Sequence, residues 1–210
     1  MEINKTTFSI LCLAVLLVGC NSGENTQPTE VIEEERGQIE AELETFSFSE
    51  SMEKADLVAE VKIISKLSEI EEPLPKTIYS ATIVDLLKGE SEILEINIMQ
   101  QGNSNWQFND NALFSTDENY ILVLKKATDD YVPYENTYWI LGEETGMYQV
   151  LDKNITVKMA LKDNQLNSIE LNDVTEKIKN KEIQSKVSST NEFQALDKKA
   201  LKEKINKEVK

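Results

Sequence analysis

The sequence has 210 residues, with 38 acidic and 22 basic side chains, no histidine and 2 cysteines, and its formal net charge is -16. Catalysis by a Ser-His-Asp or Cys-His site is excluded because histidine is lacking, and a four-cysteine zinc module is excluded by the cysteine count. Nucleic acid is not an expected partner, since phosphate binding depends on a surplus of lysine and arginine.

The first twenty residues have the pattern of an export signal. An apolar run from Phe8 to Val18 follows a single basic residue, Lys5. The run is too short for a membrane-spanning helix, which needs about 20 apolar residues, but it suits the core of a signal peptide. It ends in Leu17-Val18-Gly19-Cys20, which resembles the lipobox of bacterial lipoproteins. The resemblance implies cleavage after Gly19 and diacylglyceryl modification of the Cys20 sulfur, with an N-linked acyl chain such as palmitate as a further option.

Residues 1–19 are therefore the expected signal peptide, and Cys20 is the expected membrane anchor. Two or three acyl chains suffice for stable anchoring, because each buried methylene contributes about 0.8 kcal/mol. Cys12 lies inside the removed segment, so the mature chain keeps only Cys20 and no disulfide is expected. The expected location is the outer face of a bacterial cytoplasmic membrane, and a Gram-positive envelope is favoured.

Residues 20–45 are expected to form an acidic, disordered tether behind the lipid. The stretch contains eight glutamates among asparagine, glutamine, serine and threonine, with almost no hydrophobic periodicity. Such a composition does not bury enough apolar surface to order itself.

Residues 46–161 carry the signals of a small β domain. Residues 49–55 favour a short helix with a serine N-cap. Short runs with alternating apolar residues then predict strands, and a further strand is expected at 155–161. The main runs are 56–64, 77–87, 93–99, 119–125, 137–141 and 147–151. The last two enclose a loop with two glycines and are interpreted as a hairpin. This pattern predicts a mainly β fold, a small antiparallel barrel or sandwich with a short N-terminal helix.

Four short motifs occur in order across this domain: Ala55-Asp56-Leu57-Val58, Val84-Asp85-Leu86-Leu87-Lys88-Gly89, Glu118-Asn119-Tyr120-Ile121-Leu122-Val123-Leu124 and Gly146-Met147-Tyr148. They resemble a group of exported bacterial domains of unassigned function, which are distantly similar to the OB-type barrel of the tissue inhibitors of metalloproteinases and netrin modules. The resemblance implies an OB-like fold. In those inhibitors a free N-terminal cysteine chelates the protease zinc. That chemistry is not expected here, because Cys20 resembles an acylated residue and lies a linker away from the barrel.

Residues 162–210 are expected to form a helical, lysine-rich extension. Two segments, 172–185 and 191–210, have apolar residues at helical spacing. The face of the second segment opposite its apolar stripe is basic. One interpretation is a terminal helix packed on the barrel, and another is a basic helix that binds anionic lipid or the acidic tether.

No catalytic, metal-binding or cofactor motif accompanies these elements, so an enzyme is not expected. The main candidates for binding are aromatic side chains in or beside the polar loops: Trp106, Phe108, Tyr131, Tyr134, Tyr138 and Trp139. They suit a protein or peptide partner in the envelope. Alternatively, Trp139 and Tyr138 alternate into and out of the core while Trp106 closes the barrel mouth. Rival functions are a module for cell-wall glycan and a hydrolase with two carboxylates about 5–9.5 Å apart.

Overall fold

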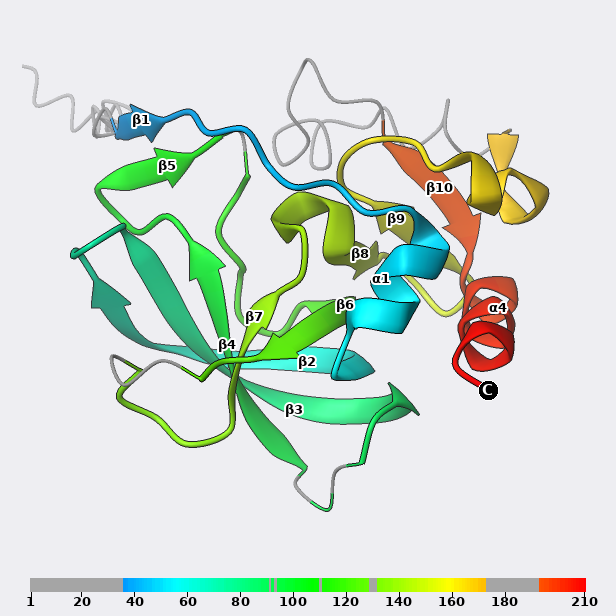
Figure 1. The fold of residues 1–210 in the computed structure, drawn as a ribbon, viewed down its shortest axis with the longest axis horizontal. Coiled ribbons are helices and arrows are strands. Elements are labelled where there is room, and N and C mark those ends of the chain that lie inside the picture. Colours follow the sequence, from blue (N-terminus) through cyan, green and yellow to red (C-terminus); the bar gives the residue numbers. More distant parts are fainter. Residues whose placement is uncertain (1–35, 91, 93, 110, 129–131, 173–192) are drawn as a thin grey trace, which may run out of the picture. The chain divides into compact units, whose positions relative to one another are not determined.

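A computed structural model describes residues 36–90, 92, 94–109, 111–128, 132–172 and 193–210 (Figure 1). The predicted signal peptide, Cys20 and the first part of the tether lie outside these residues. Tyr131 and nearly all of the helix predicted at 172–185 lie outside them as well.

The fold is mainly β, as the sequence predicts, and its centre is a closed barrel of five strands. These strands are β2 (Leu57–Ile70), β3 (Lys76–Lys88), β4 (Glu95–Gln101), β6 (Asn119–Lys126) and β7 (Thr137–Ile140). Their order is β6-β2-β3-β4-β7, and β7 closes the barrel by pairing with β6. Only β4 and β7 run parallel to each other; the other barrel neighbours are antiparallel. The resulting barrel is OB-like.

The alternation predicted for the first strand is confirmed by burial. Every second residue of β2, from Leu57 to Ile63, points into the barrel and is at most 2% exposed. Their partners inside the barrel include Ile98 and Leu122. Successive side chains of a strand point to opposite faces, so a period of two in apolar residues is enough to predict which side chains enter the barrel.

The hairpin predicted from residues 137–141 and 147–151 is wrong. β7 pairs with the end of β6, where Leu124 faces Ile140, whereas β8 (Met147–Val150) pairs with the beginning of β6, where Leu122 faces Met147. The two strands thus follow one another along the same side of β6. The chain between them forms a 3-10 turn, η1 (Glu143–Gly146), after Gly142 adopts a left-handed φ of 72°. This turn carries the chain from the barrel into a sheet extension.

The extension adds three strands to β6: β8, β9 (Ile155–Lys158) and β10 (Gln194–Asp197). β10 lies in the range that was predicted to be helical. Its residues pair with the outer edge of β9 instead, with Leu196 opposite Thr156. Asp197 then caps the last helix, α4 (Lys198–Glu208), by accepting a hydrogen bond from the backbone N–H of Ala200. Hydrogen bonding to a free strand edge therefore prevails over helical periodicity in this segment.

A second apolar core lies on the outer face of β2 and β6. It is covered by α1 (Phe48–Lys54), α4 and the 3-10 helix η2 (Asn164–Ile169). Leu201 and Ile205 of α4 are fully buried in this core. The C-terminal helix therefore packs on the barrel. α1 begins at Phe48, and its cap is Ser47 rather than a serine at position 49 or later, because Ser47 and Glu50 form a reciprocal capping box.

An ion cluster holds α4 in place. The carboxylate of Glu60 on β2 is 4% exposed and pairs with Lys198, at 2.6 Å, and with Lys202. Lys202 also pairs with Asp85 of β3 at 2.8 Å. Burial alone would raise the pKa of Glu60, but the two lysines lower it below its ordinary value. The basic face of the helix is thus partly used to bind the barrel.

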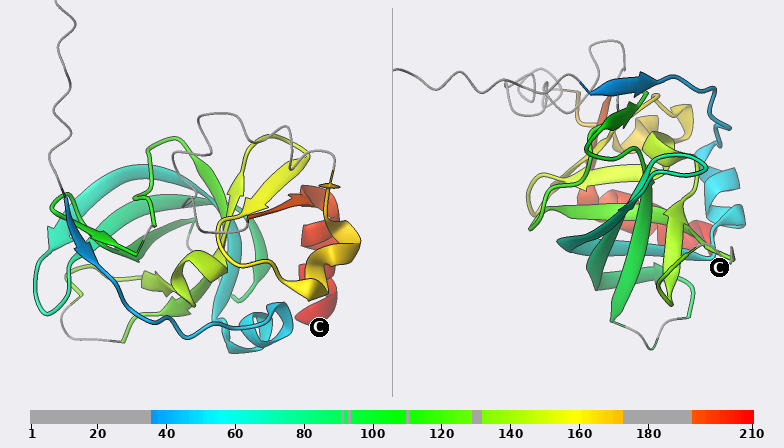
Figure 2. Two further views of the ribbon diagram at one scale, coloured as in Figure 1. Left: turned by 90° about the horizontal axis from the view of Figure 1, so that it is seen from above. Right: turned by 90° about the vertical axis from the view of Figure 1, so that its left-hand side faces the viewer.

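Part of the predicted tether is ordered. β1 (Gly37–Ile39) pairs in parallel with β5 (Trp106–Phe108) in a separate two-stranded sheet. The sequence predicts disorder throughout 20–45, so at residues 37–39 the prediction is wrong. Figure 2 shows this pair of strands at the opposite end of the fold from α4.

Candidate functional site

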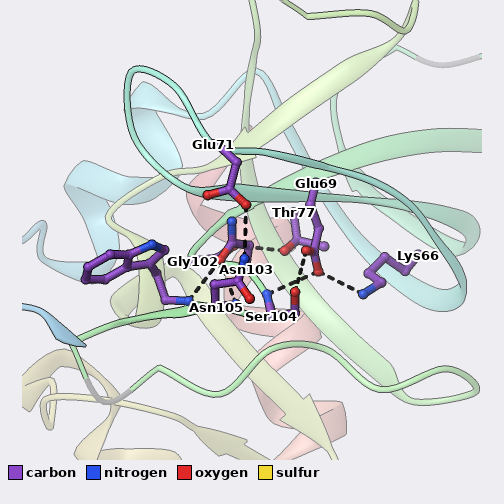
Figure 3. A network of polar contacts seen from close by, with 9 residues as sticks. Lys66, Glu69, Glu71, Thr77, Gly102, Asn103, Ser104 and Asn105 are labelled. Carbon is purple, nitrogen blue, oxygen red and sulfur yellow. Dashed lines mark hydrogen bonds and ion pairs between the residues drawn. The ribbon is translucent and has the colours of Figure 1, made fainter. Parts of the chain in front are cut away.

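The loop Gly102–Asn109, here called the Trp106 loop, connects the end of β4 to the segment that follows β5. Figure 3 shows that it lies against the β2–β3 hairpin, from which Glu69, Glu71 and Thr77 reach it. Its first residue, Gly102, has a left-handed φ of 90° and donates its N–H to the carbonyl of Pro75 at 2.8 Å. The hydroxyl of Thr77 donates to the Gly102 carbonyl, also at 2.8 Å. The loop therefore starts from a fixed point on the barrel.

Asn103 organises the turn from within. Its side chain is fully buried, and Oδ1 accepts hydrogen bonds from the backbone N–H groups of Asn105 and Trp106, both at 2.9 Å. The backbone N–H of Asn103 donates to the Trp106 carbonyl at 2.8 Å. An asparagine that bonds the backbone two and three residues ahead imitates a turn of main chain, which sets the direction of the loop.

The outer side of the loop is clamped by carboxylates. Glu69 accepts hydrogen bonds from the hydroxyl of Ser104 at 2.7 Å and from its N–H at 3.1 Å, and it pairs with Lys66 at 2.8 Å. Glu71 accepts a hydrogen bond from the Asn105 amide at 3.3 Å. Burial acts to raise the pKa of Glu69, but the bonds from Lys66 and Ser104 outweigh it and lower the pKa. Glu69 is thus held ionised.

Trp106 is exposed on this rigid loop. The residue is 41% exposed, and part of its ring covers Gly37 of β1. The register of the two strands places Gly37 opposite Trp106 and Ile39 opposite Phe108. The Trp106 loop therefore presents one aromatic side chain to solvent and one backbone edge to β1.

The aromatic candidates that the structure describes are divided between two sheets and a loop. Trp106 and Phe108 belong to the β1–β5 ribbon, where Phe108 is buried. Tyr138 and Trp139 belong to the barrel wall, with Tyr138 packed against the core and Trp139 40% exposed. Tyr134 is half-buried in the loop before β7, and Tyr131 lies outside the described residues. Sequence periodicity separates inward from outward positions but does not show that these two groups lie on different sheets.

A cavity of about 600 Å³ lies between residues 38–45 and the main fold. Asn109, Glu144, Thr145, Ala160 and Leu161 form its other wall, so none of the five aromatic candidates in the described residues lines it. Glu143, which precedes the cavity-lining residue Glu144 in the sequence, is almost fully buried. Burial raises the pKa of Glu143 to about 8, with a contribution from Glu144, against a backbone hydrogen bond from Gln101 and the charge of Lys76.

Three residues that shape this region were not singled out in the sequence: Asn103, Glu69 and Gly37. The run Gly102-Asn103-Ser104-Asn105 after a strand is typical of a turn, and it was a usable signal for the loop. No sequence signal marks Glu69 or Gly37, because their partners in this region are more than thirty positions away. Glu69 accepts a hydrogen bond from Ser104, and Gly37 lies opposite Trp106.

Among the described residues, no group of three acidic or cysteine side chains is placed to hold a metal ion. Within the same residues, every helix is too short or too polar to cross a membrane. The buried carboxylate of Glu60 and the clamping carboxylate of Glu69 are both neutralised by lysines.

The fold and the Trp106 loop define a small OB-like barrel domain with an ordered aromatic loop at one end. No protein-family model and no curated protein matches this chain.

Proposed function

We propose that the protein is a lipid-anchored extracytoplasmic module that binds a protein or peptide partner through the Trp106 loop. The anchor is Cys20 of the lipobox-like sequence Leu17-Val18-Gly19-Cys20, and the acidic segment behind it holds the barrel near the membrane surface. The negative charge of the chain agrees with a partner other than nucleic acid.

The observation that carries the proposal is an exposed tryptophan on a loop that is already ordered. Tryptophan is enriched among the residues that dominate protein interfaces. Binding is strengthened when such a residue does not have to be ordered first. The contacts of Asn103, Thr77 and Glu69 fix the backbone on which Trp106 stands.

Capture from envelope extracts tests the proposal. The full-length chain in detergent is coupled to resin, and bound proteins are identified by mass spectrometry. The matched variants are Trp106→Ala and Trp139→Ala, because the two residues are 41% and 40% exposed. We expect one protein that is retained by the parent and by Trp139→Ala and is lost with Trp106→Ala.

A direct affinity measurement with the captured protein completes the test. Loss of a central interface tryptophan costs about 2 kcal/mol or more, so Trp106→Ala should weaken binding about thirtyfold. Equal capture by all three proteins would remove the Trp106 loop from the function. A shift of Trp106 fluorescence with peptidoglycan fragments, in the absence of any protein partner, would favour the glycan-binding alternative.

A further inference from the structure

β1 is held by hydrogen bonds to a single neighbour. In the described part of the chain it pairs only with β5, apart from the eight-stranded sheet. Gly37 donates its N–H to the Asn105 carbonyl, and Asn109 donates its N–H to the Ile39 carbonyl, both at 2.8 Å. The Gln38 side chain donates to the Asn109 carbonyl at 2.7 Å, and Ala41 N–H donates to Asn109 Oδ1 at 3.0 Å. β5 thus offers a ready set of backbone partners to an extended segment.

The segment that contains β1, residues 36–45 and here called the strap, contributes little apolar burial. None of its residues belongs to either buried core cluster. Ile39 and Leu43 are only half-buried, while Gln38, Glu40, Ala41, Glu42 and Glu44 are exposed. Hydrogen bonds that replace bonds to water contribute modestly, so a strap held mainly by them is exchangeable.

The site on β5 has a strict requirement at one position. A β-carbon placed on Gly37 would lie 2.3 Å from Cε3 and 2.4 Å from Cζ3 of Trp106. These atoms belong to a rigid ring rather than to the end of a flexible chain. Any segment seated in this register must therefore have glycine opposite Trp106 unless the ring moves.

We propose that β5 is a strand-addition site for an extended peptide segment of the partner, with glycine opposite Trp106, and that the strap occupies this site in cis. This inference rests on the proposed function, since it names the chemistry of the partner for the same loop. Peptides commonly bind by adding a strand to a free edge, with backbone bonds providing affinity and side-chain positions providing specificity. Here the backbone bonds are those that β1 makes, and the specificity is the glycine at the ring.

Because the strap occupies the site on β5, a partner binds only when the strap has left it. An intramolecular competitor lowers the apparent affinity of a partner in proportion to the fraction of molecules with a free site. The strap forms one wall of the cavity that Asn109, Glu144 and Leu161 line on the other side. Partner binding therefore releases the strap, opens this cavity and lengthens the segment that leads back to Cys20.

A synthetic peptide with the strap sequence, residues 36–45, tests the proposal in trans. The full-length chain carries Trp139→Phe, so that Trp106 is its only tryptophan. Gly37→Val is added to displace the strap, and Ala41→Val, at an exposed strap position, is the matched control. Binding is followed by the emission of Trp106.

We expect the peptide to bind the Gly37→Val protein about tenfold or more tightly than the Ala41→Val control, because the cis competitor is removed. A peptide with valine in place of its glycine should not bind. Equal affinity of the two proteins, or equal binding of the two peptides, would overturn the proposal. So would exchange of straps between two copies, seen as a dimer of the Ala41→Val control by sedimentation.

If Gly37→Val fails to fold, Gln38→Ala in the protein provides a second way to loosen the strap, since it removes the side-chain donor to the Asn109 carbonyl while the peptide keeps its own glutamine. The experiments distinguish a failure of strand addition from a failure of the proposed function. Capture that depends on Trp106 but is not increased by Gly37→Val would overturn strand addition alone. Peptide binding that follows the expected pattern, with no envelope protein captured, would leave the strand-addition site standing and remove the proposed function.

Discussion

At the scale of single residues, the Trp106 loop depends on one buried amide. Asn103→Ala removes the acceptor of two partly buried backbone N–H groups, and the loss of each such hydrogen bond costs about 0.5–1.5 kcal/mol. We expect the free energy of unfolding in urea to fall by about 1–3 kcal/mol. Ser104→Ala is the control, because Ser104 is exposed and should change stability by about 0.5 kcal/mol. Similar losses for both variants would contradict the organising role of Asn103.

Glu143 gives the protein an unusual dependence on pH. Its pKa is raised from 4.5 to about 8 by burial, so between these values the folded state keeps a proton that the unfolded state has lost. Stability should therefore fall as pH rises through this range, by at most about 1.4 kcal/mol per pH unit. In Glu143→Gln this slope should disappear when urea denaturation is measured from pH 5 to 8. An unchanged slope in the variant would mean that another group is responsible.

At the scale of elements, the docking of α4 combines an apolar face with an ion cluster. Glu60→Gln leaves Lys198 and Lys202 without their buried counter-charge. Removing one partner of a buried pair is strongly destabilising, and the partial exposure of the lysines reduces the effect to about 2–3 kcal/mol. Lys199→Ala is the control, since the pair of Lys199 with Glu203 is largely exposed and contributes about 0–0.5 kcal/mol. Equal unfolding free energies for parent and Glu60→Gln would show that the apolar face alone holds the helix.

At the scale of the whole molecule, two buried groups combine into a stability minimum near pH 8. Burial lowers the pKa of Lys158 to about 8, so between pH 8 and 10.5 the unfolded state binds more protons than the folded state and stability rises with pH. Glu143 acts in the opposite direction below pH 8. The thermal midpoint should therefore be lowest near pH 8 and increase on both sides of it, up to about pH 9, above which the burial that raises the pKa of Tyr79, Tyr120 and Tyr148 acts against the rise. Lys158→Met should remove the rise above pH 8, and a monotonic profile in the parent would contradict this account.

The proposed membrane anchor is also tested on the whole protein. Cys20→Ala removes the sulfur that the lipobox-like sequence offers for acylation. We expect the parent to fractionate with membranes and to carry a diacylglyceryl group on its N-terminal peptide, and the variant to lose this modification. A parent peptide with a free Cys20 thiol, or an uncleaved N-terminus, would contradict the proposed anchor.

Much of the barrel could be predicted from local pattern. The alternation of Leu57, Ala59, Val61 and Ile63 gave the inward face of β2 correctly, and the structure has Tyr138 against the core and Trp139 exposed. The aromatic residues could be selected as binding candidates from the sequence, and their role in binding stays a prediction. The location of Trp106 and Trp139 on different sheets depends on strand pairing, which a local pattern does not report.

Local sequence patterns and composition were enough to predict the strands of the barrel, the acidic balance and the chemistries that the missing histidine excludes. These properties follow from composition or from neighbours two to four positions apart. The tertiary structure decided that residues 37–39 pair with β5, that residues 194–197 form a strand and that Glu143 is buried. Each of these depends on a partner far along the chain, since a free strand edge or a dry interior exists only after the rest of the chain has folded.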